Sequence, residues 1–155
     1  MKNDIRLLIM DVDGTLTDGK INISSQGELF KSFSIKDGLG IHDILPKHNI
    51  LPIIITGRQS DIVKHRCDEL GIDMLFQGVR DKISVLKQVL EQLKLDFSNC
   101  AYIGDDLNDL DCMNMCAVKG CPADAANEVK NVCDFVSSKN GGEGAVREFI
   151  EYLIR

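Results

Sequence analysis

Short apolar runs alternate with amphipathic segments along the chain. The runs are typical of strands buried on both faces and lie at residues 5–10, 51–55, 74–76 and 101–103, with weaker signals at 117–118 and 134–136. Apolar side chains at helical spacing mark the segments 38–47, 59–70, 81–93, 107–115 and 143–154. Strands joined by crossover helices form a parallel sheet with helices on both faces. We therefore predict an α/β, Rossmann-like doubly wound fold in one domain over residues 1–155.

Three further features of the pattern are local. Residues 20–23 and 28–35 predict a β-hairpin around Ser24-Ser25-Gln26-Gly27, directly after the first strand. The helix at 38–47 is expected to stop near Pro46. The stretch Gly141-Gly142-Glu143-Gly144 predicts a mobile loop before the last helix.

Polar side chains follow the first predicted strand, in Asp11-Val12-Asp13-Gly14-Thr15. Alternation along a strand would point Asp11 and Asp13 the same way. Two carboxylates that face one point repel each other unless a cation lies between them or one is protonated. Turn formation by Asp, Gly and Thr is the alternative interpretation.

The next strand runs into Thr56-Gly57-Arg58, at the predicted start of a helix. A hydroxyl and backbone N–H groups at such a place favour an anion, although Thr56 could also serve only as an N-cap. A cation in the first turn of a helix opposes the helix dipole by roughly 0.3–1 kcal/mol. An anionic ligand would compensate this cost at Arg58. The same argument applies to Lys82 at the start of the following helix, for which an ordinary surface lysine is the alternative interpretation.

The last of these positions is Gly104-Asp105-Asp106-Leu107-Asn108-Asp109, after the strand at 101–103. Three acids within five residues favour a bound cation over helix capping alone. Because carboxyl ends of parallel strands share one edge of the sheet, these groups should meet there. Hard oxygen ligands in small number suit Mg²⁺, and a lysine beside them suits a phosphoryl group.

Composition narrows the function further. The net charge of −6 argues against binding to nucleic acid or to an anionic membrane, since both need a basic surface. No signal peptide or membrane-spanning run is visible, so we expect a cytoplasmic protein. The six cysteines form no CxxC pair and the three histidines form no zinc motif, which leaves buried free thiols as the expectation.

In their order along the chain, these groups resemble the four motifs of the haloacid dehalogenase superfamily. The matches are Asp11-Val12-Asp13-Gly14-Thr15, then Thr56, then Lys82, and finally Gly104-Asp105-Asp106 with Asp109. The resemblance implies a phosphoric monoester hydrolase that works through an aspartyl-phosphate on Asp11. It implies that Asp13 protonates the leaving alcohol and then activates water.

The resemblance also implies the remaining roles. Mg²⁺ would be held by Asp11, the main-chain carbonyl of Asp13, and Asp105. Thr56, Gly57 and Lys82 would bind the phosphoryl oxygens. Asp106 and Asp109 would order the waters of the metal or Lys82.

The gaps between these motifs are too short for a cap domain. The chain therefore resembles the cap-less members, in which the hairpin after the first motif packs into a homotetramer with active sites at subunit interfaces. Residues 20–35 are the predicted interface. A hairpin that only covers the core of its own chain is the alternative.

Within the superfamily, residues 11–19, 36–41, 56–58, 104–107 and 141–148 resemble the phosphatases of 3-deoxy-D-manno-octulosonate (KDO) 8-phosphate, a lipopolysaccharide precursor. A sister group acts on 9-phosphates of the nine-carbon sugar acids KDN and N-acetylneuraminate and has Glu where this chain has Arg58. Arg58 therefore favours the eight-carbon substrate. Arg66 matches an arginine that holds the sugar carboxylate in that sister group, with a surface arginine as the alternative. Octulosonate phosphatases often have a C-terminal tail, whereas this sequence ends at Arg155, after its last predicted helix.

Two interpretations without phosphatase activity remain. A phospho-receiver domain also combines acids, a Thr and a Lys on such a sheet, but it has no DxD on the first strand. A non-catalytic oligomerisation module would resemble the domain fused to some CMP-sialate synthetases. The presence of Asp11, Asp13, Lys82 and Asp105 favours an enzyme.

Overall fold

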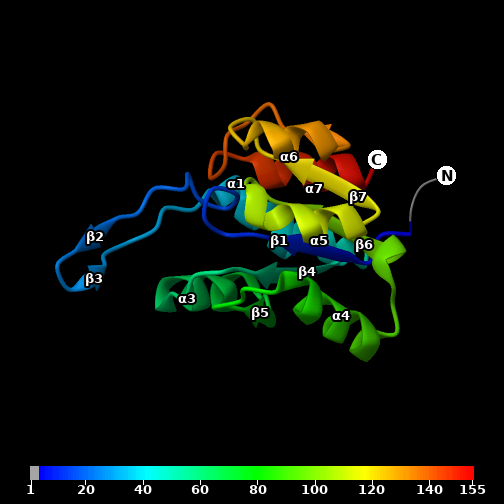
Figure 1. The fold of residues 1–155 in the computed structure, drawn as a ribbon, viewed down its shortest axis with the longest axis horizontal. Coiled ribbons are helices and arrows are strands. Elements are labelled where there is room, and N and C mark those ends of the chain that lie inside the picture. Colours follow the sequence, from blue (N-terminus) through cyan, green and yellow to red (C-terminus); the bar gives the residue numbers. More distant parts are fainter. Residues whose placement is uncertain (1–3) are drawn as a thin grey trace.

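A parallel sheet of six strands forms the centre of the protein, whose computed structural model describes residues 4–155 (Figure 1). The strand order is β5-β4-β1-β6-β7-β8. The strands are β1 (Leu7–Met10), β4 (Leu51–Ile55), β5 (Met74–Phe76), β6 (Cys100–Ile103), β7 (Val118–Cys121) and β8 (Phe135–Val136). Met10 at the end of β1 pairs with Ile54 on one side and Ile103 on the other, so the carboxyl ends of these three strands lie side by side.

Helices cover both faces of the sheet. Alternate side chains of β1 supply two separate cores, with Leu8 and Met10 in one and Leu7 and Ile9 in the other. The first core packs against the π-helical η1 (Gly40–Ile44), α2 (Leu45–Lys47), α3 (Asp61–Leu70) and α7 (Ala145–Leu153), and α1 (Ile35–Leu39) lies against α7. The second packs against α4 (Lys82–Leu93), α5 (Leu110–Met115) and α6 (Asn127–Val132). The doubly wound α/β prediction is confirmed.

Local sequence explains several helix ends. The Ser60 hydroxyl accepts a hydrogen bond from the Val63 N–H at the start of α3, and Gly71 ends that helix in the left-handed region at φ 70°. Asp81 caps α4 in the same way through the Ser84 N–H. Two 3₁₀ turns, η2 (Phe97–Asn99) and η3 (Leu107–Asp109), precede β6 and α5.

The helices differ from the prediction in two places. The helical run expected at 38–47 begins earlier, at Ile35, because the Ser34 hydroxyl caps it there; it ends at Lys47, close to Pro46 as expected, with Pro46 in the first turn of α2. A proline fits that first turn because its nitrogen needs no partner there. Helix α6 was not predicted, since Val129 is its only buried residue and no apolar stripe marks it.

The predicted hairpin exists in a much reduced form. Only β2 (Ile23–Ser24) and β3 (Gly27–Glu28) pair, and the arm that contains them projects from the body of the protein (Figure 1). A two-stranded ribbon without a third strand or a covering helix has little to hold a longer ladder. The arm exposes large apolar side chains, among them Leu29 (59%) and Phe30 (53%). Within residues 4–155, no helix has the length and apolar character needed to span a bilayer.

Candidate active site

Asp11 lies directly beyond β1, in the middle of the sheet edge. Its N–H donates to the Ile103 carbonyl at 3.2 Å, and its buried carboxylate lies 3.3 Å from the Lys82 ammonium. Burial raises the pKa of Asp11 to about 6, the negative charge of Asp109 adds to this, and Lys82 opposes it. The nucleophile predicted from the first motif and the lysine predicted from the third are therefore adjacent.

Lys82 is the first residue of α4, as predicted, and its side chain is 4% exposed. Its ammonium also lies 2.9 Å from Asp109 Oδ1, which accepts a second hydrogen bond from the Tyr102 hydroxyl at 2.6 Å. Burial lowers the pKa of Lys82, but Asp109 and Asp11 outweigh burial and hold it above its ordinary value. The lysine is thus kept charged and immobile beside Asp11. The sequence analysis did not identify Tyr102, because a tyrosine within an apolar strand looks like a core residue.

Asp105 completes the acidic group. It accepts a hydrogen bond from the Thr15 hydroxyl at 3.0 Å. Its other oxygen lies so close to Gly14, at φ 89°, that a Cβ there would be 2.0 Å away, which explains the glycine. Burial, together with the negative charges of Asp11 and Asp109, raises the pKa of Asp105 to about 8.

These carboxylates fit a divalent cation. Asp11, Asp105 and Asp109 each place one oxygen within 4.8 Å of the others. Asp109 is already saturated, because its second oxygen accepts from the N–H groups of Asp105 and Asp106 at 3.1 and 3.3 Å. Asp11 and Asp105 retain free lone pairs, and a cation between them would relieve the repulsion that raises their pKa values. A hard dication such as Mg²⁺ suits such a donor set.

Asp13 departs from the prediction made for it. The strand ends at Met10, and a turn closed by N–H groups donating to the Val12 carbonyl follows, so strand alternation does not persist. The Asp13 carboxylate is therefore not among the three clustered acids of the described residues. It lies 2.6 Å from the Lys31 ammonium and 3.9 Å from Arg58. Lys31 was missed, because nothing in its local pattern distinguishes it from other hairpin lysines.

Thr56 and Gly57 follow β4 directly, with Thr56 buried and Gly57 exposed. Because α3 begins only at Asp61 with Ser60 as its cap, the helix-cap alternative for Thr56 and the helix-dipole argument for Arg58 were both wrong. Arg58 is 55% exposed and points to the site through its contact with Asp13. The loop lies beside Asp11 for a topological reason, namely the pairing of β4 with β1.

Residues 71–150, just over half of the chain, match the family described as haloacid dehalogenase-like hydrolase. This protein belongs to the haloacid dehalogenase-like hydrolases. The match, together with relatives that are named phosphatases, makes it a homologue of phosphoric monoester hydrolases. No cap domain is evident among residues 4–155, as predicted.

Relatives within this hydrolase family are closely similar along nearly the whole chain. The 3-deoxy-D-manno-octulosonate 8-phosphate phosphatase KdsC of Escherichia coli K12 is 42% identical over 151 residues, which cover 97% of this chain and 80% of the relative. A crystal structure of the Moraxella catarrhalis phosphatase with magnesium, phosphate and KDO superposes with a TM-score of 0.93 at 40% identity, over 98% and 87% of the two chains. The cobalt-bound Haemophilus influenzae phosphatase gives 0.93 at 38% identity, over 98% and 88%.

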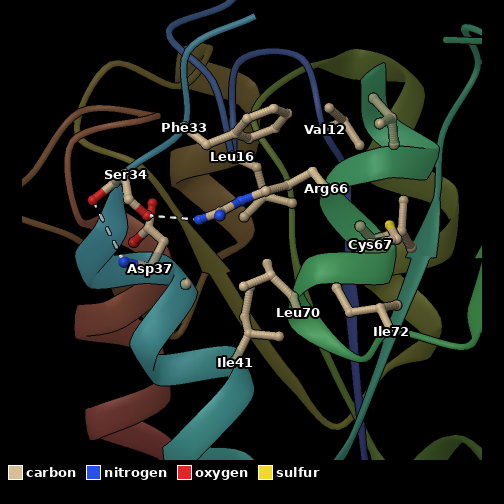
Figure 2. Close-up of a pocket in the computed structure, with 13 residues that line it drawn as sticks. Val12, Leu16, Phe33, Ser34, Asp37, Ile41, Arg66, Cys67, Leu70 and Ile72 are labelled. Carbon is tan, nitrogen blue, oxygen red and sulfur yellow. Dashed lines mark hydrogen bonds between the residues drawn. The ribbon is translucent and has the colours of Figure 1, made fainter. Parts of the chain in front are cut away.

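Two predicted site residues of this hydrolase lie apart from the acidic group. Asp106 is exposed and accepts from the Leu107 N–H at 2.8 Å, so its carboxylate caps η3. Arg66 reaches from α3 toward the start of α1, alongside Phe33, where it contacts the Ser34 carbonyl (Figure 2). Its guanidinium also forms an ion pair with Glu69 at 3.2 Å. The cavity beside it measures about 10 Å³, room for one water and too small for a sugar.

The glycine stretch before α7 supports the first motif. The Gly142 N–H donates to the Thr15 carbonyl at 3.1 Å, and the Gly141 N–H donates to Asp124 at 3.0 Å. A Cβ on Gly141 would lie 2.0 Å from the Gly14 carbonyl oxygen. The segment predicted as a mobile loop is therefore a hydrogen-bonded turn that packs on the loop between Asp11 and the hairpin.

Proposed function

We propose that this hydrolase is a Mg²⁺-dependent phosphatase that converts KDO 8-phosphate into KDO and phosphate. The observation that carries the proposal is the contact of Asp11 with Lys82 at 3.3 Å beside Asp105, in a chain 42% identical to KdsC. A carboxylate that faces a fixed ammonium group is a nucleophile beside a phosphoryl-binding cation.

The proposed reaction has two halves. Asp11 attacks phosphorus, the bond to the sugar oxygen breaks, and Asp13 gives that oxygen a proton. Asp13 then takes a proton from water as the water attacks the aspartyl-phosphate, which releases phosphate and regenerates Asp11. Thr56, Gly57 and Lys82 bind phosphoryl oxygens throughout.

Mg²⁺ held by Asp11, the main-chain carbonyl of Asp13, and Asp105 would offset negative charge on the phosphoryl group. Asp109 orders Lys82 by accepting its hydrogen bond at 2.9 Å. Asp106 caps the backbone turn at η3, and through this turn it is proposed to help order the waters of the metal.

The sugar acid is proposed from the relatives and from two arginines. Arg58 lies next to Asp13, where the leaving sugar would begin, and we propose that it contacts the sugar. Arg66 is proposed to bind the sugar carboxylate. Because it contacts the Ser34 carbonyl and Glu69 rather than Asp11 or Asp105, we propose that this role belongs to a site completed by another subunit.

We further propose a homotetramer formed through the hairpin arm. Its exposed apolar side chains, including Ile23, Leu29 and Phe30, are costly in water and suit an interface between copies. The six free thiols suit a reducing compartment such as the cytoplasm.

Phosphate release from KDO 8-phosphate and from p-nitrophenyl phosphate, with and without Mg²⁺, tests the activity. We expect turnover of both only with Mg²⁺, and a loss of at least about 10³-fold in Asp11→Ala. Arg58→Ala should raise KM for KDO 8-phosphate more than for p-nitrophenyl phosphate. An inactive wild-type protein, or full activity in Asp11→Ala, would refute the proposal.

A further inference from the structure

Lys31 belongs to the exposed hairpin arm, but its charged side chain is buried. Its side chain is 4% exposed, although the adjacent Phe30 is 53% exposed. The ammonium lies 2.6 Å from Asp13 Oδ1 and 3.0 Å from Glu28 Oε1. An ammonium group leaves water only when carboxylates replace its hydration, so the arm is shaped to bring this cation to Asp13.

The position of Lys31 is fixed from a second direction. The other carboxylate oxygen of Glu28 accepts a hydrogen bond from the Ser60 hydroxyl at 2.6 Å. Ser60 is the N-cap of α3 and is buried, so it belongs to the rigid body of the domain. A continuous chain of polar contacts therefore runs from α3 through Glu28 and Lys31 to Asp13.

Asp13 depends on this chain for its orientation. Its contact with Lys31 is short, whereas Arg58 is 3.9 Å away and more than half exposed. A group that transfers protons must point at its partner, and a displacement of about 1 Å can cost about 100-fold in rate.

We propose that Lys31 is a positioning residue that holds the Asp13 carboxylate for activation of the water that hydrolyses the aspartyl-phosphate. The hairpin arm thereby contributes to the chemistry of its own chain. This inference rests on the proposed phosphatase function. It assigns Lys31 to the second half of the reaction, in which water supplies the oxygen and Asp13 takes its proton.

The test is pre-steady-state turnover of p-nitrophenyl phosphate by the full-length Mg²⁺-loaded enzyme. Its leaving group needs little help from an acid, so kcat/KM reports Asp11 attack and is insensitive to Asp13. In Lys31→Met we expect kcat to fall about 10–100-fold, because aspartyl-phosphate hydrolysis becomes rate-limiting, while kcat/KM changes less than about threefold. A burst of p-nitrophenolate equal to the enzyme concentration should appear.

Two variants supply matched controls. Lys20→Met changes an exposed lysine of the same arm that forms no ion pair within residues 4–155. We expect the wild type to show no burst, and Lys20→Met should match the wild type both in kcat and in showing no burst. Lys31→Arg keeps the charge and should recover most of kcat. A merely structural defect would lower kcat/KM together with kcat and would give no burst.

The outcomes separate the inference from the function on which it rests. A wild-type enzyme that releases no phosphate refutes the proposed function. An active wild type with Lys31→Met that shows unchanged kcat, or an equal fall of kcat and kcat/KM without a burst, overturns the role of Lys31. If Lys31→Met does not fold, Glu28→Ala tests the same chain: a burst with kcat lowered about 3–10-fold supports it, and unchanged kinetics overturn it.

Discussion

Replacing Asp109 by Asn tests whether this buried carboxylate organises the site. Asp109 is 0% exposed and accepts four hydrogen bonds, two on each oxygen. Asparagine has nearly the same shape but only one acceptor oxygen, and its amide group donates. In one orientation the amide faces Tyr102 and Lys82, and in the other it faces two backbone N–H groups. Two donors therefore lose their partner in either case.

The expected cost follows from this count. A buried donor without a partner costs about 1–3 kcal/mol, so two of them cost about 2–6 kcal/mol. With a urea m-value of about 2 kcal/mol per molar, the unfolding midpoint should fall by about 1–3 M. Turnover should also fall, because Lys82 would keep only Asp11 as a carboxylate partner.

Urea unfolding followed by circular dichroism measures the stability, in excess Mg²⁺ so that repulsion among the acids contributes little. Tyr102→Phe is the matched control, because it removes one of the four donors and should cost only about 1 kcal/mol. A loss below about 1 kcal/mol in Asp109→Asn, at an unchanged m-value, would show that the four hydrogen bonds do not stabilise the fold as argued.

Three further predictions concern other parts of the molecule. Gly141→Ala should destabilise the protein by about 1–3 kcal/mol in urea unfolding, because its Cβ would overlap a backbone carbonyl at 2.0 Å. Gly57→Ala, with 3.6 Å to the nearest atom, should be close to neutral in the same assay. The melting temperature of the metal-free protein should fall as pH rises from about 4 to 8. In that window the raised pKa values of Asp105 (about 8) and Asp11 (about 6) lie above the 3.8 of an ordinary Asp, so the folded state binds more protons than the unfolded state. Mg²⁺ should therefore stabilise more at pH 8 than at pH 5. In the proposed homotetramer, Phe30→Asp would bury an unpaired charge at the interface, so light scattering should shift from tetramer to smaller species.

Each of these has a clear contrary result. Equal stability of the two alanine variants would mean that the glycine turn yields without cost. A metal-free melting temperature that rises from pH 5 to pH 8 would contradict the sign of the linkage. A Phe30→Asp protein with unchanged mass in solution would remove the arm from the interface.

The sheet and most of the site could be predicted from local patterns. The strand at 51–55 was placed to the residue, because a run of Ile flanked by polar residues has one interpretation. Lys82 was placed at a helix start because Asp81 precedes an apolar stripe. The hairpin ladder was predicted too long, and the helix start at Ile35 was missed. Exposed apolar residues and a serine occur both in strands and at helix starts, so the local sequence did not distinguish the two.

Strand order explains why motifs far apart along the chain could be predicted, from the sequence alone, to lie together. Asp11, Thr56 and Asp105 each follow a parallel strand, and such strands end at one edge of the sheet whatever the loops do. That argument predicts where the backbone lies but not where the side chains point. It placed Asp13 with Asp11, although the turn after Met10 directs the Asp13 carboxylate to another cation.

Periodicity and topology thus established the fold, the edge of the sheet at which the chemistry lies, and the residue types gathered there. The partners of individual side chains came only from the folded molecule: Lys31 at Asp13, Tyr102 at Asp109, and Gly141 against Gly14. The physical reason is that such contacts join residues from 7 to more than 100 positions apart, at least one of them in an irregular segment, where no repeat in the chain records which atoms meet.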